Sequence, residues 1–253
     1  MQTGLIVEAL TVGIGNSGPR LLHEVSFRLG QGERKALVGR SGSGKSLIAA
    51  SLMRLLRPPL MVRGGNVLLD EVDLFQLDQT AMRDQRGAGI FLLFQSPGSA
   101  LNPCARVRAQ IVRVAVRRHG RQAEQRSEEA LAAVGLAEAA GQYPFELSGG
   151  MRQRVLIAMA MVLEPRVLIA DEPTTGLDPL TQQEVLAGID ALLSRTGASL
   201  LFISHDLRAA GVLCRDAIVL EQGVIVAEGA WDRLPRAGVG AAAILNAARS
   251  VDQ

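Results

Sequence analysis

The chain has 253 residues, of which 48% are hydrophobic, 21% charged and 3% aromatic, and this apolar content excludes a disordered chain. Its 27 glycines and 10 prolines show no period, which excludes a collagen-like chain, and the length predicts one or two domains. A formal net charge of +2 is not the footprint of a nucleic-acid-binding protein, so no nucleic-acid partner is expected.

Cysteine content and hydropathy indicate the cellular compartment of the chain. The two cysteines, Cys104 and Cys214, are too few to hold a chain of this size and are expected to be reduced thiols. The first 18 residues lack a basic region and contain Glu8, so no signal peptide is expected. The longest apolar runs fall well short of the roughly 18 residues that a membrane span needs. We therefore expect a soluble protein, for which attachment to a membrane through a partner stays open.

The amino-terminal part of the chain is typical of paired, half-exposed strands. Residues 5–11 and 22–29 are predicted strands on either side of a turn rich in Gly, Asn, Ser and Pro at 13–19. Another short strand is predicted at Asn66–Leu69, after two glycines. These strands are expected to form an antiparallel edge of the molecule.

Three short apolar runs, each bounded by turn residues and followed by a helical pattern, predict buried parallel strands with crossover helices. The strands are Lys35–Val38, Val167–Ala170 and Ser199–Ile203. The helices are Lys45–Leu56, Leu180–Ser194 and Asp206–Leu213. A final hairpin is predicted from Ala217–Leu220 and Val224–Ala227, with its turn at residues 221–223. This alternation favours an α/β fold.

The middle of the chain, about residues 97–165, is predicted to be mostly helical. Ala109–Arg118, Arg126–Val134 and Arg152–Leu163 have helical spacing, with Arg and Glu on one side. Prolines at 97, 103 and 144 mark the loops between them. We interpret this section as a helical subdomain inserted into the α/β body.

A glycine-rich stretch between a predicted strand and a predicted helix matches the phosphate-loop pattern GxxxxGK[ST]. It consists of Gly39, Arg40, Ser41, Gly42, Ser43, Gly44, Lys45 and Ser46. Glycines let the backbone curl so that successive N–H groups point at phosphate oxygens, and the helix adds its positive end. Lys45 is expected to reach the β and γ phosphates, and Ser46 to bind Mg²⁺. An accidental glycine-rich turn is the alternative, which the flanking strand and helix make improbable.

Two adjacent acids end the predicted strand Val167–Ala170. Strand alternation points the carboxylates of Asp171 and Glu172 in different directions. We assign Asp171 to Mg²⁺, through water, and Glu172 to the general base that activates a water molecule. The pair is a weak signal alone and a strong one behind a phosphate loop.

A second candidate anion site is the stretch Ser148, Gly149 and Gly150, which precedes the helical pattern at Arg152. A helix start after Ser-Gly-Gly can bind an anion. An ordinary helix with Ser148 as its N-cap is the alternative, and taken alone the stretch favours it.

The order of these motifs resembles the ATP-binding cassette (ABC) family: phosphate loop, Gln95, Leu147-Ser-Gly-Gly-Met151, the Asp-Glu strand, Asp178 in Gly-Leu-Asp, and His205 after a strand. The resemblance extends from about residue 5 to 230. It implies that these residues form a single ATPase domain, followed by a tail at 231–253. It implies a P-loop NTPase (RecA-like) fold, with a parallel-sheet core, an antiparallel β edge subdomain and the inserted helical subdomain.

The resemblance also implies roles for individual residues. Gln95 matches the glutamine that contacts Mg²⁺ and the attacking water, and His205 the histidine that contacts the γ-phosphate. Ser148 and Gly150 match a signature that binds ATP held by the opposite subunit, and Asp178 an acid that links the two sites. The implied cofactors are ATP and Mg²⁺, and the implied mechanism is a dimer of cassettes that closes on two ATP molecules.

One feature departs from the family pattern. Members usually stack adenine on an aromatic side chain some 20 residues before the phosphate loop, and residues 11–24 contain no aromatic residue. Ile14 or neighbouring backbone is expected to pack on the base instead.

The stretches Leu93–Pro103 and Tyr143–Glu146 are similar to those of peptide and nickel importers. The partners implied are permease subunits in the membrane, a second ATPase subunit, identical or different, and indirectly an extracytoplasmic substrate-binding protein. The chain would then lie at the cytoplasmic face of the membrane, bound through the permease. The short tail without clustered cysteines favours the nickel-import subunit slightly over the peptide type.

Two other functions compete with this one. One is an ABC ATPase that serves a soluble enzyme complex instead of a transporter. The other is a nucleotide-gated module without hydrolysis, against which the presence of Glu172 and His205 argues.

Overall fold

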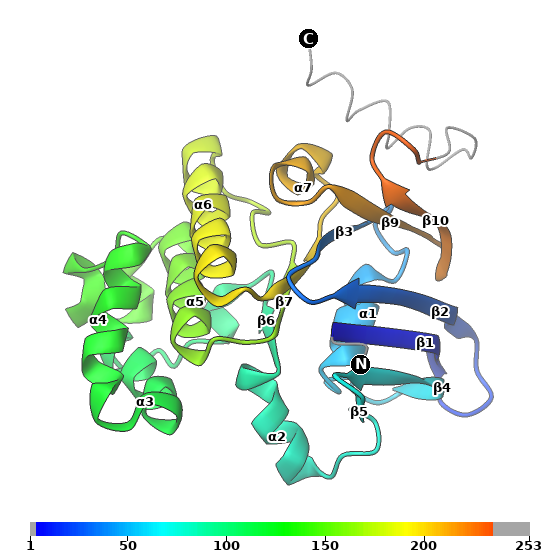
Figure 1. The fold of residues 1–253 in the computed structure, drawn as a ribbon, viewed down its shortest axis with the longest axis horizontal. Coiled ribbons are helices and arrows are strands. Elements are labelled where there is room, and N and C mark those ends of the chain that lie inside the picture. Colours follow the sequence, from blue (N-terminus) through cyan, green and yellow to red (C-terminus); the bar gives the residue numbers. More distant parts are fainter. Residues whose placement is uncertain (1–3, 235–253) are drawn as a thin grey trace.

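The computed structural model describes residues 4–234, and within them the strands form two sheets (Figure 1). The smaller sheet has the order β2-β1-β4-β5 and is antiparallel throughout. Its strands are β1 (Gly4–Ile14), β2 (Arg20–Gly30), β4 (Leu60–Leu69) and β5 (Val72–Asp73).

The larger sheet has the order β10-β9-β3-β8-β7-β6 and is parallel except for β10, which pairs antiparallel with β9. Its strands are β3 (Arg34–Val38), β6 (Ile90–Leu93), β7 (Val167–Asp171), β8 (Ser199–Ile203), β9 (Asp216–Glu221) and β10 (Val224–Ala230). The parallel strands are the short apolar runs of the sequence, as expected for a sheet that is buried on both faces.

The helices separate into those that cover the sheets and those that form the far end of the molecule, where α3 and α4 lie (Figure 1). They are α1 (Lys45–Leu52), α2 (Gln79–Ala88), α3 (Val107–His119), α4 (Ala123–Ala133), α5 (Gly149–Leu163), α6 (Pro179–Thr196) and α7 (Leu207–Leu213). Short 3₁₀ turns occur at Pro97–Ser99, Gly120–Gln122, Glu138–Gly141 and Pro144–Glu146. Among residues 4–234, no helix combines the length and the apolar character needed to cross a bilayer.

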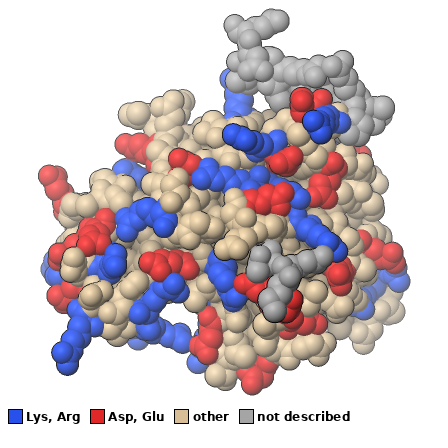
Figure 2. Space-filling view, in the orientation of Figure 1, with Lys and Arg blue, Asp and Glu red and all other residues tan. Residues whose placement is uncertain are grey.

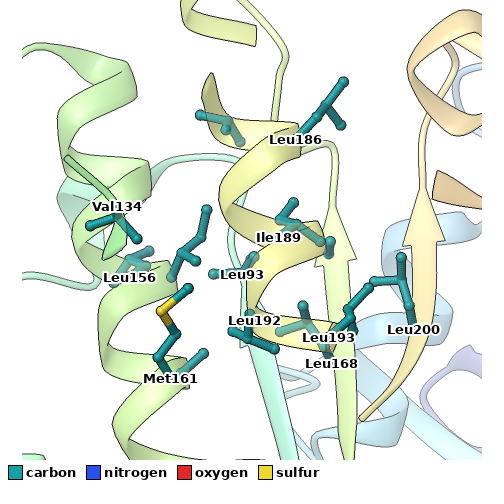
Figure 3. Packing of buried hydrophobic residues seen from close by; sticks show 14 of the residues in the cluster. Leu93, Val134, Leu156, Met161, Leu168, Leu186, Ile189, Leu192, Leu193 and Leu200 are labelled. Carbon is teal, nitrogen blue, oxygen red and sulfur yellow. The ribbon is translucent and has the colours of Figure 1, made fainter. Parts of the chain in front are cut away.

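The larger sheet separates two hydrophobic cores, because successive side chains of a strand point to opposite faces. In β8, Leu200 and Phe202 belong to the core shared with the helical part, while Leu201 and Ile203 belong to the core shared with the smaller sheet. Figure 3 shows the first core, in which Ile189, Leu192 and Leu193 of α6 lie between α5 and the strands. Both faces of the central strands are therefore fixed by packing.

The strand register brings several loops to one edge. Leu37 of β3 lies beside Ile203 of β8, which lies beside Asp171 of β7, and Ala170 lies beside Leu93 of β6. The carboxyl ends of four parallel strands therefore lie in one row. In open parallel sheets, ligand sites form at this edge.

The three buried strands, the final hairpin and the first two edge strands expected from the sequence are confirmed. The sequence analysis missed β6, β5 and α2. It also extended α1 too far, to residue 56. The helix ends at Leu52 because Arg54 adopts a left-handed backbone (φ 51°) and the Leu55 N–H donates to the Ala50 carbonyl.

Charged side chains of both signs are interspersed on the face shown in Figure 2. Several of the arginines in the helical part form exposed ion pairs, such as Arg117 with Asp84 at 2.7 Å and Arg108 with Glu128 at 2.8 Å. Exposed pairs of this kind each contribute little to stability, about 0–1 kcal/mol. They make this surface a solvated one of mixed charge.

Truncation of Phe202, the largest fully buried side chain, tests the packing of the central sheet. We expect Phe202→Ala to lower the free energy of unfolding by about 3–5 kcal/mol, because it removes buried contacts and leaves a cavity. Val212→Ala, at a side chain that is 69% exposed, is expected to change it by less than about 0.5 kcal/mol. Urea denaturation measures both, and equal midpoints would contradict the assignment of the core.

Candidate functional site

The phosphate-loop motif forms the connection between β3 and α1. Gly42 (φ 81°) and Gly44 (φ 108°) adopt backbone conformations that side chains disfavour, which explains the glycines at these two positions. The side chain of Lys45 is buried beneath the loop, where its Nζ donates to the carbonyl oxygens of Gly39, at 2.8 Å, and Arg40, at 3.2 Å. The loop therefore curls around its own lysine.

A cavity of about 540 Å³ lies in front of this loop. Its lining joins residues that follow the ends of four strands, β3, β6, β7 and β8, with one residue of the strand β2. The lining residues are Leu21, Ser41, Gly42, Gly44, Lys45, Ser46, Leu47, Gln95, Glu172, Thr175 and His205. The first N–H groups of α1 have no partner within the helix, so they are free to bind an anion in this cavity.

Two carboxylates face different partners at the end of β7. The Ser46 hydroxyl donates to Asp171 Oδ1 at 3.1 Å. The Thr175 hydroxyl donates to Glu172 Oε2 at 2.6 Å, and His205 Nδ1 lies 2.7 Å from the same oxygen. The expected divergence of the two acids is present, but its cause is not strand alternation. The strand ends at Asp171, and Glu172 turns away through a left-handed backbone (φ 49°).

Burial and charge act against each other at these groups. Burial lowers the pKa of Lys45, although Glu172 and Asp171 act to raise it. Burial likewise raises the pKa of Asp171, against the hydrogen bond from Ser46. Burial alone would raise the pKa of Glu172, but the hydrogen bonds from Thr175 and His205 outweigh it and hold that pKa below its usual value. Glu172 is thus kept as a carboxylate beside a histidine.

Ser148, Gly149, Gly150 and Asp178 form a second cluster, which does not line the cavity. Ser148 is the N-cap of α5 and accepts a hydrogen bond from the Met151 N–H at 3.2 Å. Asp178 is the N-cap of α6, where it accepts from the backbone N–H and the hydroxyl of Thr181. A Cβ at Gly150 would collide with Thr181, so the two helix starts are packed together. The N-cap interpretation of Ser148 is confirmed.

The structure therefore divides the predicted site residues into three groups. The cavity brings together Ser41, Gly42, Gly44, Lys45, Ser46, Gln95, Glu172 and His205, with Asp171 bonded to Ser46. Gly39, Arg40 and Ser43 belong to the loop without lining the cavity, and Ser148, Gly149, Gly150 and Asp178 lie in the second cluster.

Sequence reasoning missed three residues of the cavity: Leu21, Thr175 and Leu47, which directly follows the phosphate-loop motif. Thr175 follows Glu172 by three residues, and at this spacing in a turn a hydroxyl can reach back to the earlier side chain. This spacing was the signal in the sequence that could have indicated Thr175. Leu21 gave none, since it lies on a strand far from the loop in sequence. No Phe, Tyr or Trp lines the cavity, and Ile14 is 37% exposed at the end of β1.

A glycine-rich loop between a strand and a helix, at the carboxyl edge of a parallel sheet and beside an Asp-Glu strand end, defines a P-loop NTPase fold. The family model described as ABC transporter matches residues 22–175, more than half of the chain. The chain belongs to this family.

Three curated relatives show what the chain is similar to. It is 41% identical over 220 residues to a putative peptide import ATP-binding protein of Brucella melitensis, covering 82% of this chain and 65% of the relative. It is 39% identical over 222 residues to a probable D,D-dipeptide transport ATP-binding protein of Escherichia coli, covering 85% and 67%. A peptidoglycan transport ATP-binding protein of Agrobacterium fabrum is 40% identical over 242 residues, covering 92% and 44%. The chain thus spans less than two thirds of the Brucella and Agrobacterium relatives.

Two solved structures share the fold. A subunit of an ABC transporter complex from Clostridium perfringens superposes with a TM-score of 0.78 at 27% identity, covering 91% of this chain and 89% of that one. An ATP-binding cassette solved as a dimer with ADP and phosphate superposes with a TM-score of 0.77 at 25% identity, covering 89% and 98%.

The pKa of Glu172 tests the geometry of the acid cluster. We expect Thr175→Val to raise it, because the variant removes a hydrogen bond to the charged form. A lowered folded-state pKa contributes stability that is present above the unfolded-state pKa and lost as pH falls through the folded-state pKa. The variant is therefore expected to lose less stability than the wild type on acidification. Carboxyl ¹³C NMR titration measures the pKa.

Thr196→Val serves as the control, because Thr196 donates to the Leu192 carbonyl at the end of α6. If the pKa of Glu172 is the same in Thr175→Val as in Thr196→Val, then the hydrogen bond from Thr175 does not lower that pKa in the protein in solution.

Proposed function

We propose that the chain is the ATP-hydrolysing subunit of a membrane importer for peptides. The observation that carries this proposal is the convergence of Lys45, Ser46, Glu172 and His205 on one cavity. A lysine and free helix N–H groups favour a polyphosphate there, and a carboxylate held by two donors is suited to activate water.

The chain's residues divide the reaction between them. The N–H groups of the loop and Lys45 bind the phosphates of ATP, and Lys45 exchanges its carbonyl partners for phosphate oxygens. Glu172 accepts a proton from the attacking water as the water oxygen bonds to the γ-phosphorus, while the bond from that phosphorus to the β,γ-bridging oxygen breaks and ADP leaves with the electron pair. His205, fixed at Nδ1 by Glu172, presents its other ring nitrogen toward the γ-phosphate, and Gln95 orients the water.

The donor set at the loop fits Mg²⁺. The Ser46 hydroxyl and the Asp171 carboxylate lie 3.1 Å apart, and Gln95 lines the same cavity, so the available ligands are oxygens. The described residues contain no cluster of three or more His, Cys, Asp or Glu side chains that suits a metal. Such a sparse set fits a cation held largely by substrate phosphates. Bound Mg²⁺ would neutralise charge on the phosphates, with Ser46, Gln95 and Asp171 as its protein ligands or water-mediated contacts.

The second cluster supports a composite site. Ser148, Gly149 and Gly150 begin α5 in an exposed N-cap next to Asp178, away from the cavity. We propose that they complete the cavity of a second ATPase subunit across a dimer, and that permease subunits hold the pair at the cytoplasmic face of the membrane. Residues 5–230 would form this single ATPase domain, with the helical insertion at about 97–165. The expected tail at 231–253 lies mostly outside the described residues.

The identity of the cargo rests on the relatives. Their names refer to peptides, D,D-dipeptides and peptidoglycan, which supports the peptide alternative over the nickel alternative. A substrate-binding protein outside the membrane would deliver the cargo to the permease. No residue of this chain is proposed to touch the cargo.

Glu172→Gln tests the catalytic assignment. We expect ATP hydrolysis to fall by about 10²–10⁴-fold, because the amide cannot accept the proton of the attacking water. ATP binding is expected to persist, because Lys45 and the loop are unchanged. Phosphate release measures the first and isothermal titration calorimetry the second.

Glu8→Gln, an exposed change on β1, is the control and is expected to retain activity. Undiminished hydrolysis in Glu172→Gln would show that another group is the base. If the wild type does not bind ATP, the proposed function itself is wrong.

The composite site predicts that nucleotide drives association. We expect Glu172→Gln protein with Mg-ATP to elute as a dimer in size-exclusion chromatography, and the double variant with Ser148→Arg to remain monomeric. The arginine adds bulk and charge at the exposed N-cap of α5. An ATP-dependent dimer that tolerates Ser148→Arg would contradict the composite site. A single variant that binds ATP as a monomer would indicate a different chain as the natural partner.

A further inference from the structure

The turn between β9 and β10, residues 221–223, contacts the phosphate loop although it does not line the cavity. Strand β9 pairs in parallel with β3, with Val219 beside Val38, so β9 ends next to the start of the loop. The Gly223 N–H donates to the Ser43 carbonyl at 2.9 Å, and the Gly223 carbonyl accepts from the His23 N–H at 2.9 Å. The turn thus joins the phosphate loop to β2.

The turn and its neighbours approach each other closely through backbone atoms, both at the phosphate loop and at β2. A Cβ at Gly39 would collide with the carbonyl oxygen of Leu220, and a Cβ at Gly223 would collide with that of Leu21. Gly223 also has a φ of 79°, which L side chains rarely adopt. Glycine is therefore required at position 223 both for the approach and for the conformation.

The hydrogen bond to Ser43 sets the direction of a binding group. A trans peptide unit is planar, and its C=O and N–H point in opposite directions. Because the Ser43 carbonyl points at Gly223, the Gly44 N–H of the same peptide unit points away from the turn. Gly44 lines the cavity, so this N–H is directed to the side where phosphate would bind.

The side chains of Ser43 and Glu221 add no hydrogen bond to the contact between the turn and the phosphate loop. Within residues 4–234, the Oγ of Ser43 and the Oε1 of Glu221 are both buried and have no hydrogen-bond partner. The backbone bond between Gly223 and Ser43 is thus the polar link between the turn and the loop.

We propose that the turn at 221–223 is a positioning element for phosphate binding: the Gly223 N–H orients the Ser43–Gly44 peptide so that the Gly44 N–H is aimed at the polyphosphate. The inference rests on the proposed function, because it concerns the same ligand. By reciprocity, a bound polyphosphate stabilises the turn and its link to β2 and β10.

Gly223→Ala tests the proposal against the matched variant Gly197→Ala. Gly197 has a similar φ of 68° but open space around its Cβ, so the control carries the backbone strain without the collision. Calorimetry with ATP and with inorganic tripolyphosphate is expected to show at least about tenfold weaker binding of both ligands by Gly223→Ala. Gly197→Ala is expected to bind both like the wild type. Equal binding by Gly223→Ala and the wild type would overturn the proposal while leaving the proposed function intact.

If Gly223→Ala does not fold, amide hydrogen exchange in the wild type provides a second test of the proposal. Tripolyphosphate is expected to slow exchange of the Gly223 amide severalfold, because binding stabilises its hydrogen bond. The Gly197 amide, which donates to the Leu193 carbonyl, is expected to be unaffected. A Gly223 amide indifferent to bound ligand would overturn the proposal. A wild type that binds neither ATP nor tripolyphosphate would overturn the proposed function and this inference with it.

Discussion

The hydrogen-bond register of the parallel strands is the constraint on which the site depends. The carboxyl ends of β3, β8, β7 and β6 are aligned because Leu37, Ile203, Asp171 and Leu93 are brought into one row by neighbouring ladder pairs. A shift of one strand by a single residue would reverse its faces and move each of its core side chains to the opposite core. The same packing that buries the sheet therefore fixes where Lys45, Glu172, Gln95 and His205 lie.

The cavity combines unfavourable burial with compensating hydrogen bonds. Lys45, Asp171 and Glu172 are all partly removed from water, and burial opposes the charged form of each. Each of them is held by a specific partner: loop carbonyls for Lys45, the Ser46 hydroxyl for Asp171, and Thr175 with His205 for Glu172. On the proposed function, a polyphosphate and its cation would take the place of some of these partners.

Much of the fold and of the site was predictable because local patterns determine them. Runs that are buried on both faces, such as residues 200–203 of β8, are apolar throughout, and the phosphate loop needs glycine where φ is positive. The strand β6 was missed because it has only four residues and its identity depends on pairing with β7. The place of Leu21 in the cavity and the contact of the turn at 221–223 with the phosphate loop escaped for the same reason. Both are tertiary contacts, and those of the turn join segments about 180–200 residues apart, which no local pattern records.

The buried amine of Lys45 has a consequence for chemical labelling. The chain has two lysines, and their environments differ. Burial lowers the pKa of Lys45, whereas at Lys35 burial is outweighed by the hydrogen bond and charge of Glu228, which raise that pKa. At neutral pH the amine of Lys45 is therefore the more nucleophilic of the two. An acylating reagent that reaches both side chains would therefore meet more unprotonated amine at Lys45, so the effect of a lysine label on the phosphate loop has to be measured before the label is used.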